Sequence, residues 1–168
     1  MIQIFDNILT ETELIELDFI CENFYAHIQP VVLPDGNFSL YYRNRININT
    51  TLIDFQKRIL KKIEEVLFLQ TNIIDMSINK ITTETNKNDK FHKDISDLSV
   101  VIFLNDDIIG GEFVYEIDGK IYNIKPKKNT GIIMNNKLLH KVSPVHKGIR
   151  YTFITFLDVV KKDKKTLI

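Results

Sequence analysis

The stretch KFHKDISDLSVVIFLND places a histidine and an aspartate, His92 and Asp94, one residue apart before a run rich in Val, Ile and Phe. In a strand, residues i and i+2 point to the same face, so these two side chains would project together from the start of the strand that leads to 98–104. Burying an imidazole and a carboxylate is unfavourable unless each finds a polar partner. The pair therefore predicts contact either with water or with a metal ion.

A third candidate ligand, His140, lies in the apolar stretch KLLHKVSPV, which we predict to be another strand. Two histidines and one carboxylate leave three coordination positions of a metal open, an arrangement that suits non-haem Fe(II). The alternatives are a hydrogen-bonded core histidine for His140 and an exposed strand end for His92 and Asp94. Together the three residues predict an Fe(II) site that is also the catalytic centre.

A guanidinium and a hydroxyl follow in the predicted strand GIRYTFITF, where Arg150 and Thr152 share one face. The planar fork of an arginine matches a carboxylate, and a hydroxyl adds a further hydrogen bond. An anion that chelates the iron at one end and meets Arg150 at the other would satisfy both groups, and 2-oxoglutarate has this form. An ion pair between Arg150 and Glu112 is the structural alternative.

The motifs HKD, GGEFVY and HKVSPVHKGIRY resemble, in this order, those of the 2-oxoglutarate- and Fe(II)-dependent dioxygenases, specifically the prolyl 4-hydroxylase-like branch. The segments IQIFDNILTETEL and FLNDDIIGGEF are similar to the family's opening strand and helix and to its Leu-Asn and Gly-Gly segment. The resemblance implies a jelly-roll fold, His92, Asp94 and His140 as iron ligands, and Arg150 at the distal carboxylate of 2-oxoglutarate. It also implies hydroxylation with O2, release of succinate and CO2, and ascorbate as a candidate reductant.

Two positions depart from the family's pattern. Members often carry a tyrosine about ten residues before the first histidine and another before the Leu-Asn pair, where this sequence has Thr82 and Phe103. Thr82 can still donate a hydrogen bond, whereas Phe103 cannot. We therefore predict Arg150, Thr152 and Thr82 as the residues that bind the cosubstrate.

The elements that must position these residues change in character near residue 72. Thr10 and Glu13 form a capping-box pattern at a helix start, and apolar residues at helical spacing predict a second helix over 52–69. Short apolar strands follow, with a two-residue hairpin signal at Asp118-Gly119. We expect an α+β, mainly β fold, a double-stranded β-helix (jelly roll) with N-terminal helices packed on one sheet. The predicted single domain spans 1–168, with a helical part over about 1–72 and the jelly-roll core over about 73–160.

Two segments allow more than one interpretation. The irregular stretch over 26–49, which contains Tyr41, Tyr42, Arg43 and Arg45, is compatible with a substrate lid or an edge strand. Gly110-Gly111 favours a bulge or turn with close backbone packing near the site.

The composition narrows the class of partner. Lys and Arg number 22, as do Asp and Glu, so no net charge attracts a polyanion, and we expect no nucleic-acid partner. No apolar run reaches membrane-spanning length, and the N-terminal segment is acidic where a signal peptide would be basic. The single cysteine, Cys21, excludes an intrachain disulfide. We expect a cytoplasmic protein whose partners are O2 and a peptide, protein or small-molecule substrate.

Three functions fit these residues. The first is hydroxylation of a peptidyl, such as a prolyl, or small-molecule substrate; the second is a catalytically impaired metal-binding jelly-roll module. The third is oxidative demethylation of a nucleobase, but those relatives usually carry a second arginine six residues beyond the first, where Phe156 stands. Neither the substrate nor the oligomeric state can be read from the sequence, because specificity resides in loops.

Overall fold

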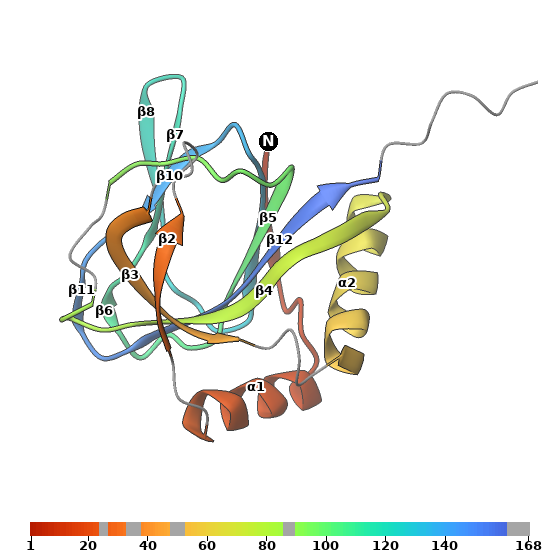
Figure 1. The fold of residues 1–168 in the computed structure, drawn as a ribbon, viewed down its shortest axis with the longest axis horizontal. Helices are drawn as coiled ribbons and strands as arrows, with labels where there is room; N and C mark the ends of the chain where they lie inside the picture. The colour runs from red at the N-terminus through yellow and green to blue at the C-terminus, as the bar shows by residue number, and fades with distance from the viewer. Residues whose placement is uncertain (24–26, 33–37, 48–52, 86–89, 161–168) are drawn as a thin grey trace, which may run out of the picture.

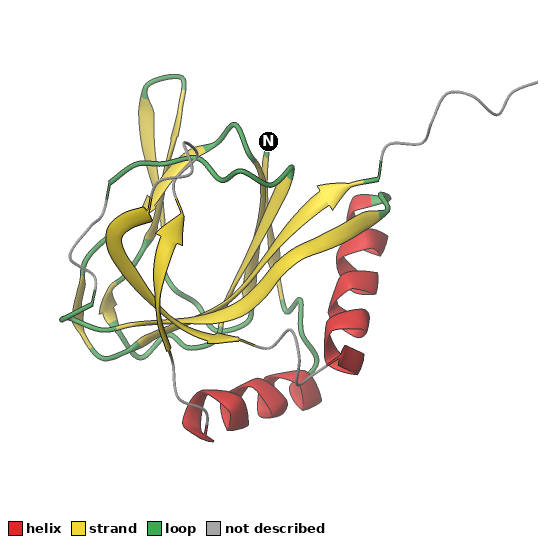
Figure 2. Ribbon diagram, viewed as in Figure 1, coloured by secondary structure: helices red, strands yellow, loops and turns green. Residues whose placement is uncertain are grey.

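The structure is a computed structural model that describes residues 1–23, 27–32, 38–47, 53–85 and 90–160. Strands predominate within these ranges (Figures 1 and 2). The elements are β1 (Ile2–Asp6), α1 (Glu11–Asn23), β2 (His27–Val32), β3 (Phe38–Asn47), α2 (Ile53–Leu67), β4 (Thr71–Ile81), β5 (Leu98–Phe103), β6 (Ile109–Gly110), β7 (Phe113–Ile117), β8 (Lys120–Ile124), β9 (Thr130–Asn135), β10 (Leu139–Val142), β11 (Val145–Lys147) and β12 (Arg150–Val159).

The strands form a large antiparallel sheet in the order β1-β9-β5-β12-β4-β3-β2, a smaller one in the order β10-β7-β8, and a short pair of β11 with β6. One buried apolar cluster joins the two larger sheets, because it takes residues from β5, β9 and β12 on one side and from β7 on the other. The two sheets therefore face each other around a common interior. This arrangement confirms the predicted jelly roll.

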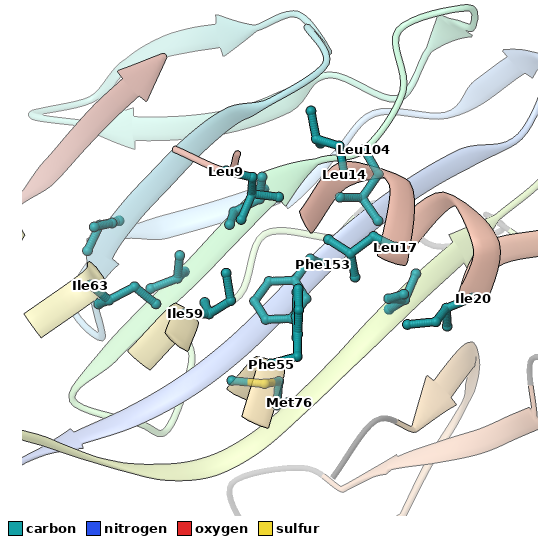
Figure 3. Packing of buried hydrophobic residues seen from close by; sticks show 14 of the residues in the cluster. Leu9, Leu14, Leu17, Ile20, Phe55, Ile59, Ile63, Met76, Leu104 and Phe153 are labelled. Atoms are coloured by element: carbon teal, nitrogen blue, oxygen red, sulfur yellow. The ribbon is translucent and has the colours of Figure 1, made fainter. Parts of the chain in front are cut away.

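The helices cover the outer face of the seven-stranded sheet. Apolar residues recur at helical spacing in α1 and α2, and they pack on alternate residues of the central strands (Figure 3). Phe55 of α2 meets Phe153 of β12 edge to face, with ring centroids 5.9 Å apart. The predicted packing of the N-terminal helices on one sheet is thus confirmed. Among the described residues, no helix is long and apolar enough to cross a membrane.

A capping box starts α1, as the sequence predicts. The Thr10 backbone N–H donates to the Glu13 carboxylate over 2.7 Å, and the Glu13 N–H donates to the Thr10 hydroxyl over 3.3 Å. The same carboxylate accepts a hydrogen bond from Lys62 of α2. Glu13 is almost fully buried, so this contact fixes one helix against the other beneath the sheet.

The N-terminal part of the chain is not purely helical. β1 pairs with β9, and β2 and β3 form a hairpin that extends the seven-stranded sheet beyond β4. The boundary predicted near residue 72 therefore does not separate helices from sheet. The stretch over 26–49 contributes strands, while the PDGN turn lies outside the described residues.

The hairpin predicted at Asp118-Gly119 is present between β7 and β8. Ile117 pairs with Lys120, and both turn residues have positive φ, 51° and 74°. Positive φ at both central positions matches the type I′ turn that Asp-Gly favours. This turn sets the register in which β8 lies beside β7.

We expect replacement of Glu13 to make stability less dependent on acidic pH. Burial by itself raises the pKa of Glu13, but the hydrogen bonds from Lys62 and Thr10 outweigh burial, so the net pKa is below its ordinary value. The ionised carboxylate therefore stabilises the fold fully above the unfolded-state pKa of about 4.3, and this contribution is lost as pH falls through the lower folded-state value. Glu13→Gln should reduce the free energy of unfolding at pH 7 by about 1–3 kcal/mol and flatten its decline below pH 5.

Urea denaturation between pH 3 and pH 7 measures both effects. Glu65→Gln is the matched control, because Glu65 lies on α2 in an exposed pair with Lys61 at 3.8 Å. Equal losses for the two variants would contradict the role assigned to Glu13.

Candidate functional site

His92 and His140 are joined through their backbones. The His92 N–H donates to the His140 carbonyl over 2.9 Å, and the His140 N–H donates to the His92 carbonyl over 3.0 Å. Residues paired in this way lie directly opposite each other with side chains on one face, and the two ring centroids are 4.5 Å apart. The segment around His92 thus extends the smaller sheet beyond β10.

The structure corrects the predicted position of the HKD motif. His92 and Asp94 do not begin the strand over 98–104, because β5 starts at Leu98 and the residues between form a bend. The bridge to β10 places the His92 side chain beside that of His140. Sequence periodicity cannot detect such a bridge, since its partner lies far along the chain.

The three predicted ligands converge. One ligand atom from each of His92, Asp94 and His140 lies within 4.8 Å of the other two. The Asp94 carboxylate is shared, with one oxygen 3.9 Å from His92 Nε2 and the other 3.6 Å from His140 Nε2. Two imidazole nitrogens and a carboxylate oxygen are the donor set of a non-haem iron site, so these residues could hold a metal ion.

Backbone carbonyls determine that Nδ1 of each imidazole carries a hydrogen. His92 Nδ1 lies 3.1 Å from the Lys90 carbonyl, and His140 Nδ1 lies 3.0 Å from the Leu138 carbonyl. A carbonyl oxygen only accepts, so each Nδ1 must carry a hydrogen, and in the neutral imidazole the lone pair then lies on Nε2, which faces the shared space. This is the tautomer of a histidine that binds a metal through Nε2.

The cluster lies at the edge of the interior. The side chains of Asp94 and His140 are only 11% and 7% exposed, whereas that of His92 is 40% exposed. The His140 ring stacks on buried Phe113, with centroids 5.2 Å apart and planes 19° from parallel. One side of the cluster is therefore packed on the core and the other faces solvent.

Arg150 and Thr152 share the inner face of β12, as predicted, and both are buried; Arg150 is only 1% exposed. Arg150 Nε donates to the Gly111 carbonyl over 2.8 Å, and Nη1 donates to the Thr152 hydroxyl over 3.0 Å. The guanidinium carbon lies 5.2 Å from the ring centroid of Phe103, which pairs with Thr152 across β5 and β12. A permanent positive charge is thus held inside the barrel.

Glu112, the alternative partner predicted for Arg150, forms a hydrogen bond with Ser143. Its carboxylate accepts a hydrogen bond from the Ser143 hydroxyl, and this bond is the main cause of a lowered pKa for Glu112. The Ser143 hydroxyl also accepts from the Glu112 backbone N–H over 2.9 Å. Glu112 therefore ties the start of β7 to the segment after β10.

The double glycine lets the chain pass close to Arg150. Gly111 has φ +71°, and a Cβ there would lie 2.9 Å from Arg150 Cδ; at Gly110, with φ +83°, it would lie 2.1 Å from the Pro144 carbonyl oxygen. Both positions therefore require glycine. The segment from Gly111 to Phe113 contacts the guanidinium at one end and the His140 ring at the other, so it connects the arginine to the histidines.

Thr82 lies in the turn that follows β4. Its hydroxyl accepts hydrogen bonds from the backbone N–H groups of Glu84 and Thr85, each over 3.3 Å. The hydroxyl therefore serves the local turn, and the contacts of the described residues do not join it to Arg150 or Thr152.

Two inward-facing polar residues of β4 were not predicted. Asn79 pairs directly with Thr152, and Ser77 pairs with Ile154, so both point to the same interior as Arg150. Both are buried, and among the described residues Asn79 Oδ1 and Ser77 Oγ have no hydrogen-bond partner. The alternation of Met76 and Ile78 with these polar residues is the sequence signal that could have identified them.

The sequence matches the family model described as "2OG-Fe(II) oxygenase superfamily" over residues 78–158. This match contains all three clustered ligands together with Arg150 and Thr152. No curated protein matches the sequence.

Solved structures share the fold. An oxidoreductase of the 2OG-Fe(II) oxygenase family from Burkholderia pseudomallei is 20% identical, with a TM-score of 0.67 over 94% of this chain and 84% of that one. A prolyl hydroxylase from Trichoplax adhaerens, in complex with a hypoxia inducible factor peptide fragment, is 13% identical, with a TM-score of 0.69 over 94% and 83%.

A viral collagen prolyl hydroxylase from Paramecium Bursaria Chlorella virus-1, solved as a 2OG complex, is 16% identical, with a TM-score of 0.66 over 93% and 94%. These similarities span nearly the whole chain, including the strands that precede the family match. Residues 78–158, which carry the histidine and aspartate cluster and the buried arginine, therefore match the 2OG-Fe(II) oxygenase superfamily model, within a fold shared with prolyl hydroxylases.

Proposed function

We propose that this protein is an Fe(II)- and 2-oxoglutarate-dependent dioxygenase that hydroxylates a C–H bond of a peptidyl substrate, such as a prolyl residue, or of a small molecule. Succinate and CO2 would be the coproducts. The observation that carries the proposal is the convergence of two Nε2 atoms, each with Nδ1 held by a carbonyl, on the Asp94 carboxylate. Ascorbate as a reductant and a cytoplasmic location are parts of the same proposal.

The donor set fits Fe(II). His92, Asp94 and His140 would hold the ion, and three side-chain ligands leave positions for a chelating cosubstrate and for O2. When bound, the ion supplies O2 activation coupled to oxidation of the cosubstrate. The protein orients the imidazoles through the Lys90 and Leu138 carbonyls and excludes water from one side by packing His140 on Phe113.

The polar lining of the interior fits a dicarboxylate. Arg150 and Thr152 would bind the distal carboxylate, because a guanidinium buried beside a hydroxyl is matched by an anion with two acceptor oxygens. Asn79 stands directly opposite Thr152, and its buried amide oxygen has no hydrogen-bond partner among the described residues, so the amide is available to a ligand. After a flip of the amide, Asn79 would donate to the same carboxylate. Thr82 remains a prediction as a fourth residue that contacts the cosubstrate.

The choice of a peptidyl substrate over a nucleobase rests on two observations. The chain shares its fold with prolyl hydroxylases. The position at which nucleobase demethylases usually carry a second arginine holds Phe156, which packs against the apolar cluster inside the barrel. A partly buried phenylalanine offers no charge to a nucleic-acid phosphate.

We expect Asp94→Ala to abolish iron binding and succinate formation. The variant removes the carboxylate that lies between the two imidazoles, so the ion would lose one of three protein ligands. Addition of 2-oxoglutarate to the wild-type protein with Fe(II) under anaerobic conditions should produce a visible charge-transfer band that Asp94→Ala lacks. Lys93→Ala, which changes the exposed residue between the two ligands, should retain the band.

Succinate release from 2-oxoglutarate, assayed in air, separates an enzyme from a binding module. Wild-type protein that binds iron and shows the band but never forms succinate would support the catalytically impaired module. Absence of the band in the wild type would contradict the cosubstrate assignment.

We expect Arg150→Lys to weaken 2-oxoglutarate binding while iron binding persists. Lysine keeps the charge but loses the fork and the simultaneous bonds to Gly111 and Thr152, so the 2-oxoglutarate concentration for half-maximal band formation should rise about tenfold or more. Arg58→Lys, on the exposed side of α2, is the control. Equal half-saturation for wild type and Arg150→Lys would exclude Arg150 from the cosubstrate site.

A further inference from the structure

A single row of residues crosses the smaller sheet, from the cluster of His92, Asp94 and His140 to the free edge of that sheet. His92 pairs with His140, His140 with Tyr115 of β7, and Tyr115 with Tyr122 of β8. Directly opposite residues of antiparallel strands point to the same face, so all four side chains lie on the face that holds the candidate ligands. The two tyrosines therefore belong to the surroundings of the site rather than to the outside of the barrel.

Aromatic rings connect the row. The His140 ring stacks on Phe113, whose centroid is 6.2 Å from that of Tyr115. Tyr115 in turn stacks on Tyr122 at 5.2 Å, with planes 17° from parallel. Burial decreases along this series, from buried His140 and Phe113, through partly buried Tyr115, to Tyr122, which is 43% exposed. The series therefore leads from the histidine and aspartate cluster to the solvent.

The same face continues to the tip of the hairpin. Ile117 lies two residues after Tyr115 and is 40% exposed. The β7–β8 hairpin projects beyond β10 (Figure 1), and β8 pairs only with β7 among the described strands. We call Tyr115, Ile117 and Tyr122 the hairpin face. It begins beside His140 with partly buried Tyr115 and ends in Ile117 and Tyr122, which are exposed, and exposed apolar surface beside a site is typical of binding sites.

We propose that the hairpin face binds the substrate, and that the substrate is a peptide. This inference rests on the proposed function. From β10 to β8 is two strand spacings, or about 10 Å, which corresponds to about three residues of an extended peptide. A peptide with one residue at the cluster of His92, Asp94 and His140 can therefore lay the side chain of a residue about three positions away on Tyr122, whereas a metabolite much shorter than about 10 Å held at the cluster cannot reach it.

The tyrosine pair also indicates which side chain it would take. The exposed Tyr122 ring is supported from behind by Tyr115, so it forms a rigid flat surface that suits a ring. Proline-rich segments dock on aromatic surfaces of this kind, and aromatic side chains stack on them. We therefore expect a proline or an aromatic residue about three positions from the modified residue.

Selection from random peptides tests the inference without a known substrate. A phage library of random dodecapeptides is selected on the full chain loaded with Fe(II) and 2-oxoglutarate under anaerobic conditions. Enriched peptides should share a proline or aromatic residue. A synthetic copy of the most enriched peptide should bind the wild-type protein, and Tyr122→Ala should weaken this binding about tenfold, as measured by fluorescence anisotropy.

Two variants separate recognition from structural damage. Tyr122→Phe keeps the ring and should bind the peptide within about twofold of the wild type. Ile121→Ala changes an exposed residue on the opposite face of β8 and should have no effect. The inference is overturned if the wild type enriches no peptide family, or if Tyr122→Ala weakens binding no more than Ile121→Ala does.

Succinate release by the wild-type protein without peptide distinguishes this inference from the function on which it rests. Succinate formation with no Tyr122-dependent binding would exclude the hairpin face as a peptide-binding site and would support the dioxygenase function. Tyr122-dependent binding without succinate or a charge-transfer band would support the peptide-binding site and exclude the dioxygenase reaction.

Discussion

The backbone bridge between His92 and His140 is the constraint on which the site depends. Two reciprocal hydrogen bonds place the residues directly opposite each other, so their imidazoles share one face without any contact between the side chains being required. Asp94 then needs only two further residues of chain to place its carboxylate between the rings. A site built on paired backbones is held more firmly than one built on loop side chains, because the two amide hydrogen bonds fix both Cα positions.

The two faces of the seven-stranded sheet serve different purposes. The outer face buries apolar side chains against α1 and α2, and it supplies the hydrophobic stabilisation (Figure 3). The inner face of β4 and β12 carries Asn79, Arg150 and Thr152 at buried positions. Burial of a guanidinium is unfavourable unless hydrogen bonds accompany it, and those to Gly111 and Thr152 meet part of this requirement. The helices therefore make it possible for the interior to remain polar near the site.

The segment after β6 couples the two halves of the site. Gly111 adopts a backbone conformation that other residues rarely adopt, and its carbonyl accepts from Arg150. Two residues later Phe113 supports the His140 ring, and Tyr115 continues the same face toward Tyr122. One short stretch thus positions the arginine, supports an imidazole and begins the hairpin face. A change in the backbone conformation of this stretch would therefore displace all three parts of the site.

Much of this protein could be predicted from local sequence patterns. The capping box at Thr10, the helical period of α2, the Asp118-Gly119 turn and the shared face of Arg150 and Thr152 depend on residues that are neighbours in sequence, so periodicity and turn chemistry were sufficient. The types of the candidate ligands and their order along the chain also predicted that three ligand atoms would converge and that the sequence would match the 2OG-Fe(II) oxygenase superfamily model.

What only the tertiary structure decided depends on partners distant in the chain. The HKD motif is held by a bridge to β10 rather than by the start of β5, and Thr82 belongs to a local turn. Asn79 enters the site only because β4 lies beside β12 in one particular register, and Tyr122 approaches it only because β7 lies between β8 and β10. Strand pairing is set by the packing of whole sheets. Because the sequence pattern of a strand does not depend on which strand it pairs with, no local pattern could predict these contacts.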